Sequence, residues 1–139
     1  MKRIITAAAA VIALAGCGSS AVASDVPTPP ACELASKIPK TTQADHSRWD
    51  IYPSDVLPSA IDHCVVEAYG QGQDIVATFR TDAERTTWAQ KVAHQYGDIF
   101  GSDRVDGDRW TMITSGEHAE NMPAAAAAMP GGRWVDGSK

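Results

Sequence analysis

The chain has 139 residues, which fits one folded domain, and its 17 acidic residues outnumber 12 basic ones to give a formal net charge of −5. Nucleic-acid binding requires a basic patch, so this balance argues against a nucleic-acid partner. It also argues against docking by charge onto anionic lipid head groups. Composition therefore indicates a small domain but does not identify its partner.

The amino-terminal segment has the organisation of an export signal. Lys2 and Arg3 make its start positive, and residues 4–16 contain no charged side chain. This run is shorter than the roughly 20 apolar residues that span a bilayer, so we expect export followed by cleavage. Cleavage after Ala21-Val22-Ala23 would release a soluble protein that begins at Ser24.

A second cleavage site competes with the first. Leu14-Ala15-Gly16-Cys17 resembles the lipobox of bacterial lipoproteins at every position, although the resemblance covers only the leader. It implies that residues 1–16 are removed as a lipoprotein signal peptide and that Cys17 carries a diacylglyceryl group. Each buried CH₂ contributes about 0.8 kcal/mol, and two or more chains give stable attachment. We therefore expect the protein on the extracytoplasmic face of the cell membrane, held to the lipid bilayer through acyl chains on Cys17.

The two remaining cysteines, Cys32 and Cys64, form an even pair in an exported chain, which predicts a disulfide. In the chain-entropy model such a bridge stabilises the fold by about 3–4 kcal/mol. The alternative is a redox-active or metal-binding pair, for which the sequence offers neither C-x-x-C spacing nor a neighbouring pair of histidines. Residues 17–30, with small residues first and prolines later, are predicted to be a flexible lipid-anchored linker.

A single α+β domain is predicted over residues 31–115. Cys32 and Ala35 have helical spacing after Pro30, which predicts a short helix that ends before Pro39. Residues 39–62 are predicted to be an ordered loop held by apolar side chains. Residues 63–70 and 74–80 are rich in β-branched and aromatic residues and are joined by a glycine-bearing connection, which predicts a hairpin.

The strongest helix signal follows this hairpin. Thr81 and Glu84 match a capping box, and the helix is predicted to run to Tyr96 and stop at Gly97. A four-residue recurrence predicts one face packed against the sheet, formed by Trp88, Val92 and Tyr96 and widened by Ala89 and Ala93. Arg85 and Gln95 are expected on the flanks of this stripe, where replacement by alanine changes stability by less than about 0.5 kcal/mol.

Residues 109–115 are predicted to be a third strand. The result is a small antiparallel sheet with one packed helix in the order β-β-α-β, preceded by the short disulfide-linked helix. Residues 116–139 are predicted to be a mostly disordered tail, because a run of five alanines is too short for an isolated helix. Trp134 in this tail is left open as either docked on the domain or exposed.

The sequence carries no local pattern typical of a catalytic or metal-binding site. The four histidines at positions 46, 63, 94 and 118 have no zinc-site spacing, and His94 is expected on the polar flank of its helix. Two polar clusters are interpreted as solvated surface: Asp45, His46 and Asp50 in a loop, and Asp103, Asp106 and Asp108 at a tight hairpin entry that departs from a calcium loop. No nucleophile elbow or phosphate loop is present. No catalytic residue, metal ligand or cofactor is therefore predicted.

These patterns favour a membrane-anchored exported lipoprotein that acts as a surface interaction module. Its partner would be an envelope protein or a cell-wall component that the sequence does not identify. The alternative is a superinfection exclusion or immunity lipoprotein encoded by a phage or prophage, an idea that rests on analogy of size and leader. An envelope enzyme or calcium binder is a third interpretation, without positive sequence evidence.

Overall fold

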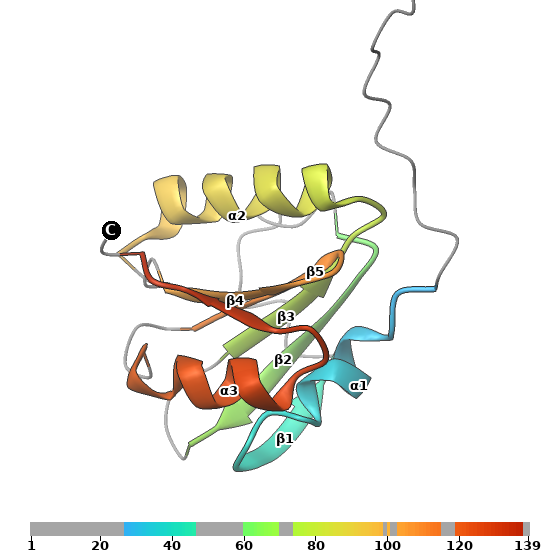
Figure 1. Ribbon diagram of the computed structural model, residues 1–139, viewed down its shortest axis with the longest axis vertical. Coiled ribbons are helices and arrows are strands. Elements are labelled where there is room, and N and C mark those ends of the chain that lie inside the picture. Colours follow the sequence, from blue (N-terminus) through green and yellow to red (C-terminus); the bar gives the residue numbers. More distant parts are fainter. Residues whose placement is uncertain are drawn as a thin grey trace, which may run out of the picture.

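The computed structural model describes residues 27–46, 60–69, 74–98, 100, 103–114 and 119–137. These residues form three layers, in which a central sheet lies between helix α2 on one side and helices α1 and α3 on the other (Figure 1). The elements in chain order are α1 (Ala31–Ala35), β1 (Thr41–Asp45), β2 (Asp62–Ala68), β3 (Asp74–Thr78), α2 (Asp82–Tyr96), β4 (Arg104–Gly107), β5 (Trp110–Ile113), the 3₁₀ turn η2 (Ala119–Asn121), α3 (Met122–Ala128) and β6 (Arg133–Val135).

The described strands form one six-stranded antiparallel sheet in the order β1-β2-β3-β5-β4-β6. The predicted α+β class, the pairing of β2 with β3 and the third predicted strand, β5, are confirmed. The chain leaves β3 through α2, enters β4 and returns as β5, which inserts between β3 and β4. Strands β1 and β6 therefore form the two opposite edges of the sheet.

Both faces of the sheet are buried, whereas the sequence predicted only one packed helix. Side chains of a strand alternate between the two faces, and in β3 all five positions are buried. Ile75 and Ala77 contribute to a core under α2, while Val76 contributes to a second core with α1 and α3. The second core also contains Val105 of β4 and Met112 of β5.

Helix α2 begins and ends as predicted. Thr81 accepts a hydrogen bond from the backbone N–H of Glu84, and the Glu84 carboxylate accepts one from the backbone of Thr81, which completes the capping box. Trp88 and Val92 are buried against the sheet, and Tyr96 is half-buried. The Trp88 ring packs 5.4 Å from that of Phe79. The predicted stripe is thus confirmed, except that Ala93 is exposed.

The disulfide between Cys32 and Cys64 is confirmed. It joins α1, which buries Ala31, Leu34 and Ala35, to a strand in the interior of the sheet. The prediction of a loop over residues 39–62 was wrong at its start, because residues 41–45 form β1 beside β2. The middle of β1 is exposed, so it lacks the apolar alternation by which a strand is recognised in a sequence.

The prediction of a mostly disordered tail over residues 116–139 was wrong. Residues 119–137 form η2, α3 and β6, so the folded unit extends well beyond residue 115. Met122, Ala125 and Met129 are buried in the second core, and β6 pairs with β4. An alanine helix of this length is unstable in isolation, but the burial of one face supplies the missing stabilisation.

Candidate functional site

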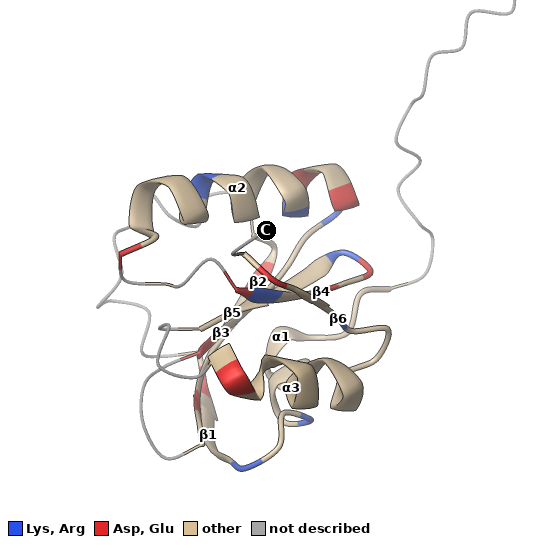
Figure 2. Cartoon of the chain, turned by 60° about the vertical axis from the view of Figure 1, so that its left-hand side comes forward, with Lys and Arg blue, Asp and Glu red and all other residues tan. Residues whose placement is uncertain are grey.

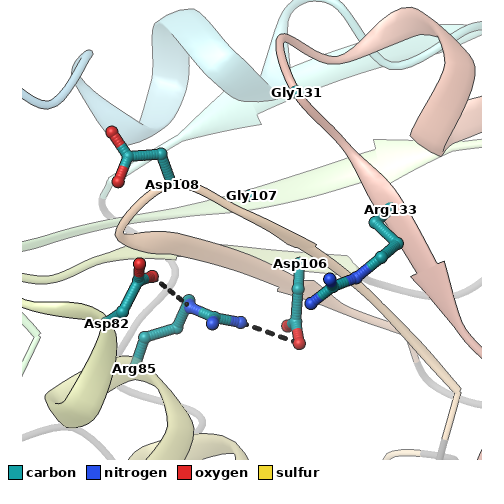
Figure 3. Close-up of a pocket in the computed structure, with 7 residues that line it drawn as sticks. All are labelled: Asp82, Arg85, Asp106, Gly107, Asp108, Gly131 and Arg133. Carbon is teal, nitrogen blue, oxygen red and sulfur yellow. Dashed lines mark hydrogen bonds and ion pairs between the residues drawn. The ribbon is translucent and has the colours of Figure 1, made fainter.

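A charged pocket of about 310 Å³ lies where the first turns of α2 approach β4, the β4–β5 turn and the segment that leads into β6. Acidic and basic residues lie close to one another in this region (Figure 2). The pocket is lined by Asp82, Arg85, Asp106, Gly107, Asp108, Gly131 and Arg133 (Figure 3). Its walls thus come from parts of the chain that are distant in sequence.

The centre of the pocket is an ion-pair network around Arg85. The Arg85 guanidinium lies 2.7 Å from an Asp106 carboxylate oxygen and 2.9 Å from an Asp82 oxygen (Figure 3). The Arg85 and Asp106 side chains are 10% and 5% exposed, so this pair is withdrawn from water. Burial of the Arg85 guanidinium opposes its charged form, but the charges and hydrogen bonds of Asp106 and Asp82 outweigh burial, so the pKa of Arg85 is raised.

Asp106 has further partners that fix its position. Arg104 donates to both carboxylate oxygens at 3.1 and 3.2 Å, and the Thr111 hydroxyl donates to Oδ1 at 2.7 Å. A buried carboxylate that accepts several charge-assisted hydrogen bonds is held rigidly. Asp106 therefore joins β4 and β5 to the first turn of α2.

Asp82 lies at the mouth of the pocket with a 58% exposed side chain. Burial of part of the carboxyl opposes ionisation, but the backbone N–H of Arg109 at 3.1 Å and the nearby Arg85 outweigh it, so the pKa of Asp82 is lowered. Asp82 therefore stays charged where it connects α2 to the β4–β5 turn.

Two sequence predictions for this region were wrong. Arg85 does not lie on a solvated flank, because it is 9% exposed and occupies the buried side of α2. Asp106 is not a solvating acid, because its side chain is enclosed by cations. The hairpin itself is confirmed, and Asp108 at its turn is exposed. Asp103 accepts a hydrogen bond from the backbone N–H of Gly137 at 2.7 Å and so fastens the segment that follows β6.

Strand β6 adds an exposed edge to the pocket. Arg133 pairs with Asp106 across the two strands, so its side chain lies on the pocket face of the sheet, as Figure 3 shows. Among the described residues its guanidinium has no ion-pair or hydrogen-bond partner. Trp134 points to the opposite face and is 42% exposed. The turn before β6 requires Gly131, whose φ of 65° is unfavourable for a residue with a side chain.

A second polar cluster lies beside the disulfide, near the other edge of the sheet. His46 Nε2 is 3.2 Å from Asp62 Oδ1, and His46 Nδ1 is 3.6 Å from the Cys32 sulfur. The ring of His63 lies 6.2 Å from that of His46. His46 is exposed, in line with the sequence interpretation, but it is not isolated surface, because it contacts Asp62 and Cys32. The structure also places a pair of histidines beside the disulfide, which the sequence spacing did not indicate.

Asp62 is held in this cluster by two backbone groups. Its Oδ2 accepts a hydrogen bond from the N–H of Ala31 at 2.8 Å, and its Oδ1 accepts one from the N–H of His63 at 2.9 Å. Burial lowers the pKa of His63, and this effect outweighs the Asp62 charge and the hydrogen bond to the His46 backbone, both of which raise it. The carboxylate thus has a fixed direction toward His46.

Of the remaining predicted site residues, the structure describes His94, which is exposed on α2 as expected. Cys17 with its lipobox, the linker up to residue 26, Asp50 and His118 lie outside the described residues. Within the described ranges no group of three or more His, Cys, Asp or Glu side chains is arranged to hold a metal ion.

Comparisons with protein-family models, with curated proteins and with solved structures found no match for this chain. None of the helices in the described part combines the length and apolar content needed to cross a membrane. The geometry of the two sites is therefore the basis for inferring function.

Proposed function

We propose that the protein is an exported lipoprotein, anchored on the extracytoplasmic face of the cell membrane through Cys17, whose domain binds another envelope protein. The leader supports the anchoring, because Leu14-Ala15-Gly16-Cys17 resembles a lipobox and residues 17–30 have the composition expected of a tether. The observation that carries the binding role is the edge formed by β6, where Arg133 and Trp134 are exposed on opposite faces.

The occupant that this edge fits best is an extended peptide segment with an acidic side chain. A strand at the edge of a sheet offers backbone groups to an added strand. Side chains of that strand would alternate between the faces. One would meet Arg133 above the pocket, and its neighbour would meet Trp134 on the other side.

The pocket is lined by three aspartates and two arginines, so the preference for a carboxylate at the first of these positions comes from Arg133 and not from the pocket as a whole. Arg85 and Arg104 are paired with Asp82 and Asp106, which leaves Arg133 as the cation that can receive a new partner. A guanidinium binds a carboxylate through two parallel hydrogen bonds. Arg and Trp are also the residues that most often dominate binding energy at protein interfaces.

The proposal is tested with the full chain in its native membrane. A photoreactive amino acid placed at Trp134 should crosslink to one envelope protein, and the same probe at Gln95, an exposed position on α2, should not. Arg133→Glu should weaken capture of that protein at least tenfold, whereas Gln95→Ala should leave it unchanged. Equal capture by Arg133→Glu and by the unchanged chain, or recovery of a cell-wall glycan in place of a protein, would contradict the peptide occupant.

A further inference from the structure

The two cysteines of the disulfide differ in exposure. Cys64 is fully buried in β2, at 0% exposure, whereas Cys32 on α1 is partly exposed. The side chain that contacts the Cys32 sulfur, His46, is itself 57% exposed. Of the two cysteines, Cys32 is therefore the one open to attack by a thiol from solvent, while Cys64 is shielded.

The contacts of His46 favour one tautomer of its neutral ring. Because Nε2 faces the Asp62 carboxylate at 3.2 Å, the neutral ring carries its proton on Nε2. Nδ1 then presents a lone pair at 3.6 Å from the Cys32 sulfur. Asp62 cannot turn away easily, since Ala31 and His63 donate backbone hydrogen bonds to it. An oriented carboxylate, a histidine and a sulfur in this order form the arrangement that activates thiols in enzymes.

We propose that Cys32, His46 and Asp62 form a thiol–disulfide exchange site, in which the Cys32–Cys64 disulfide oxidises thiols that reach Cys32. The co-reactant is a thiol, carried either by a small molecule or by a cysteine of another exported protein. This site lies toward β1, at the opposite edge of the sheet from β6, and does not depend on the peptide-binding role proposed above.

The exchange proceeds in two balanced steps. His46 Nδ1 takes the proton of the incoming thiol, and the resulting thiolate attacks the Cys32 sulfur. A new bond forms between these two sulfurs as the bond between Cys32 and Cys64 breaks, and the released Cys64 thiolate takes up a proton. A second thiol then attacks the mixed disulfide, which leaves both protein cysteines reduced and the two thiols oxidised to a disulfide.

The test uses the full oxidised chain in detergent, treated in separate arms with glutathione and with a short cysteine-containing peptide. The initial rate of mixed-disulfide formation is measured from pH 5 to 9, and the modified cysteine is identified by mass spectrometry after an acid quench. We expect the adduct on Cys32, at a rate that His46→Ala lowers at least about tenfold at neutral pH. The arm that reacts faster identifies the source of the thiol.

Three further measurements separate this role from a structural one. Added imidazole should restore the rate of His46→Ala, because it replaces the missing base, and Asp62→Asn should slow the reaction while the melting curve stays close to that of the unchanged chain. His94→Asn, an exposed histidine on α2, serves as the matched control. Equal rates in His46→Ala and His94→Asn, adducts only on Cys64, or reaction only in urea would overturn the proposal.

Discussion

The buried ion-pair network allows a sharp prediction for Asp106→Asn. This change keeps the shape of the side chain but removes a negative charge that is only 5% exposed and faces both Arg85 and Arg104. Breaking a buried pair by removing one partner costs about 3–5 kcal/mol, because the other charge stays buried without compensation. Arg85 keeps its contact with Asp82, so we expect the lower end, about 3 kcal/mol. For a domain of this size that lowers the melting temperature by roughly 10–20 °C.

Urea unfolding at pH 7, followed by circular dichroism, measures this loss. Asp98→Ala, which removes an exposed carboxylate after the end of α2, is the control and should change stability by less than about 0.5 kcal/mol. The double variant Arg85→Met with Asp106→Leu should be more stable than Asp106→Asn, because no uncompensated charge remains at Arg85. A loss below about 1 kcal/mol for Asp106→Asn would refute the view that the network is withdrawn from water.

Four other outcomes are expected. Trp88→Ala should lower the free energy of unfolding by about 3–5 kcal/mol, measured by urea titration; an unmoved curve would show that the ring is not in the core. Cys64→Ser should cost about 2–5 kcal/mol, and two freely alkylated thiols in the untreated native protein would argue against the bridge. Cys17→Ala should abolish incorporation of labelled palmitate and retention in the membrane fraction, and equal labelling of both forms would remove the case for lipidation. Burial lowers the pKa of His63 from its usual value of 6.5, so on acidification the unfolded chain takes up a proton before the folded chain does. The free energy of unfolding should therefore fall as the pH drops through 6.5. Thermal melts across this pH range should show a smaller fall for His63→Gln than for the unchanged chain.

Signals that are local in sequence predicted the hairpin and helix α2 correctly. The capping box at Thr81 and Glu84 and the stripe of Trp88 and Val92 lie within one helix, and both are observed. The burial of Arg85 could have been found in the same way, because it precedes Trp88 by three residues and Ala89 by four. A charged residue ordinarily favours water, and the acidic partners that allow Arg85 to be buried are not evident from the helix alone.

The missed elements depend on contacts that no short window contains. Helix α3 is stable because Met122 and Met129 enter the core, and β6 exists because it pairs with a strand some thirty residues earlier. Likewise His46 reaches Asp62 and Cys32 only after β1 has paired with β2 and α1 has docked. No spacing motif links these positions, so neither site could be assembled from the sequence alone.

The position of the disulfide determines how the domain carries mechanical load. Cys32 lies close to the amino-terminal side of the folded part, so tension applied there passes through the sulfur bridge into β2, which is held between β1 and β3. The segment from residue 33 to residue 63, including β1, is bypassed and cannot be drawn out while the bridge is intact. Cleavage of the bridge would add this segment to the stretched path, a gain of roughly 100 Å at full extension. The oxidation state of this one bond therefore decides whether the segment between Cys32 and Cys64 can extend under tension.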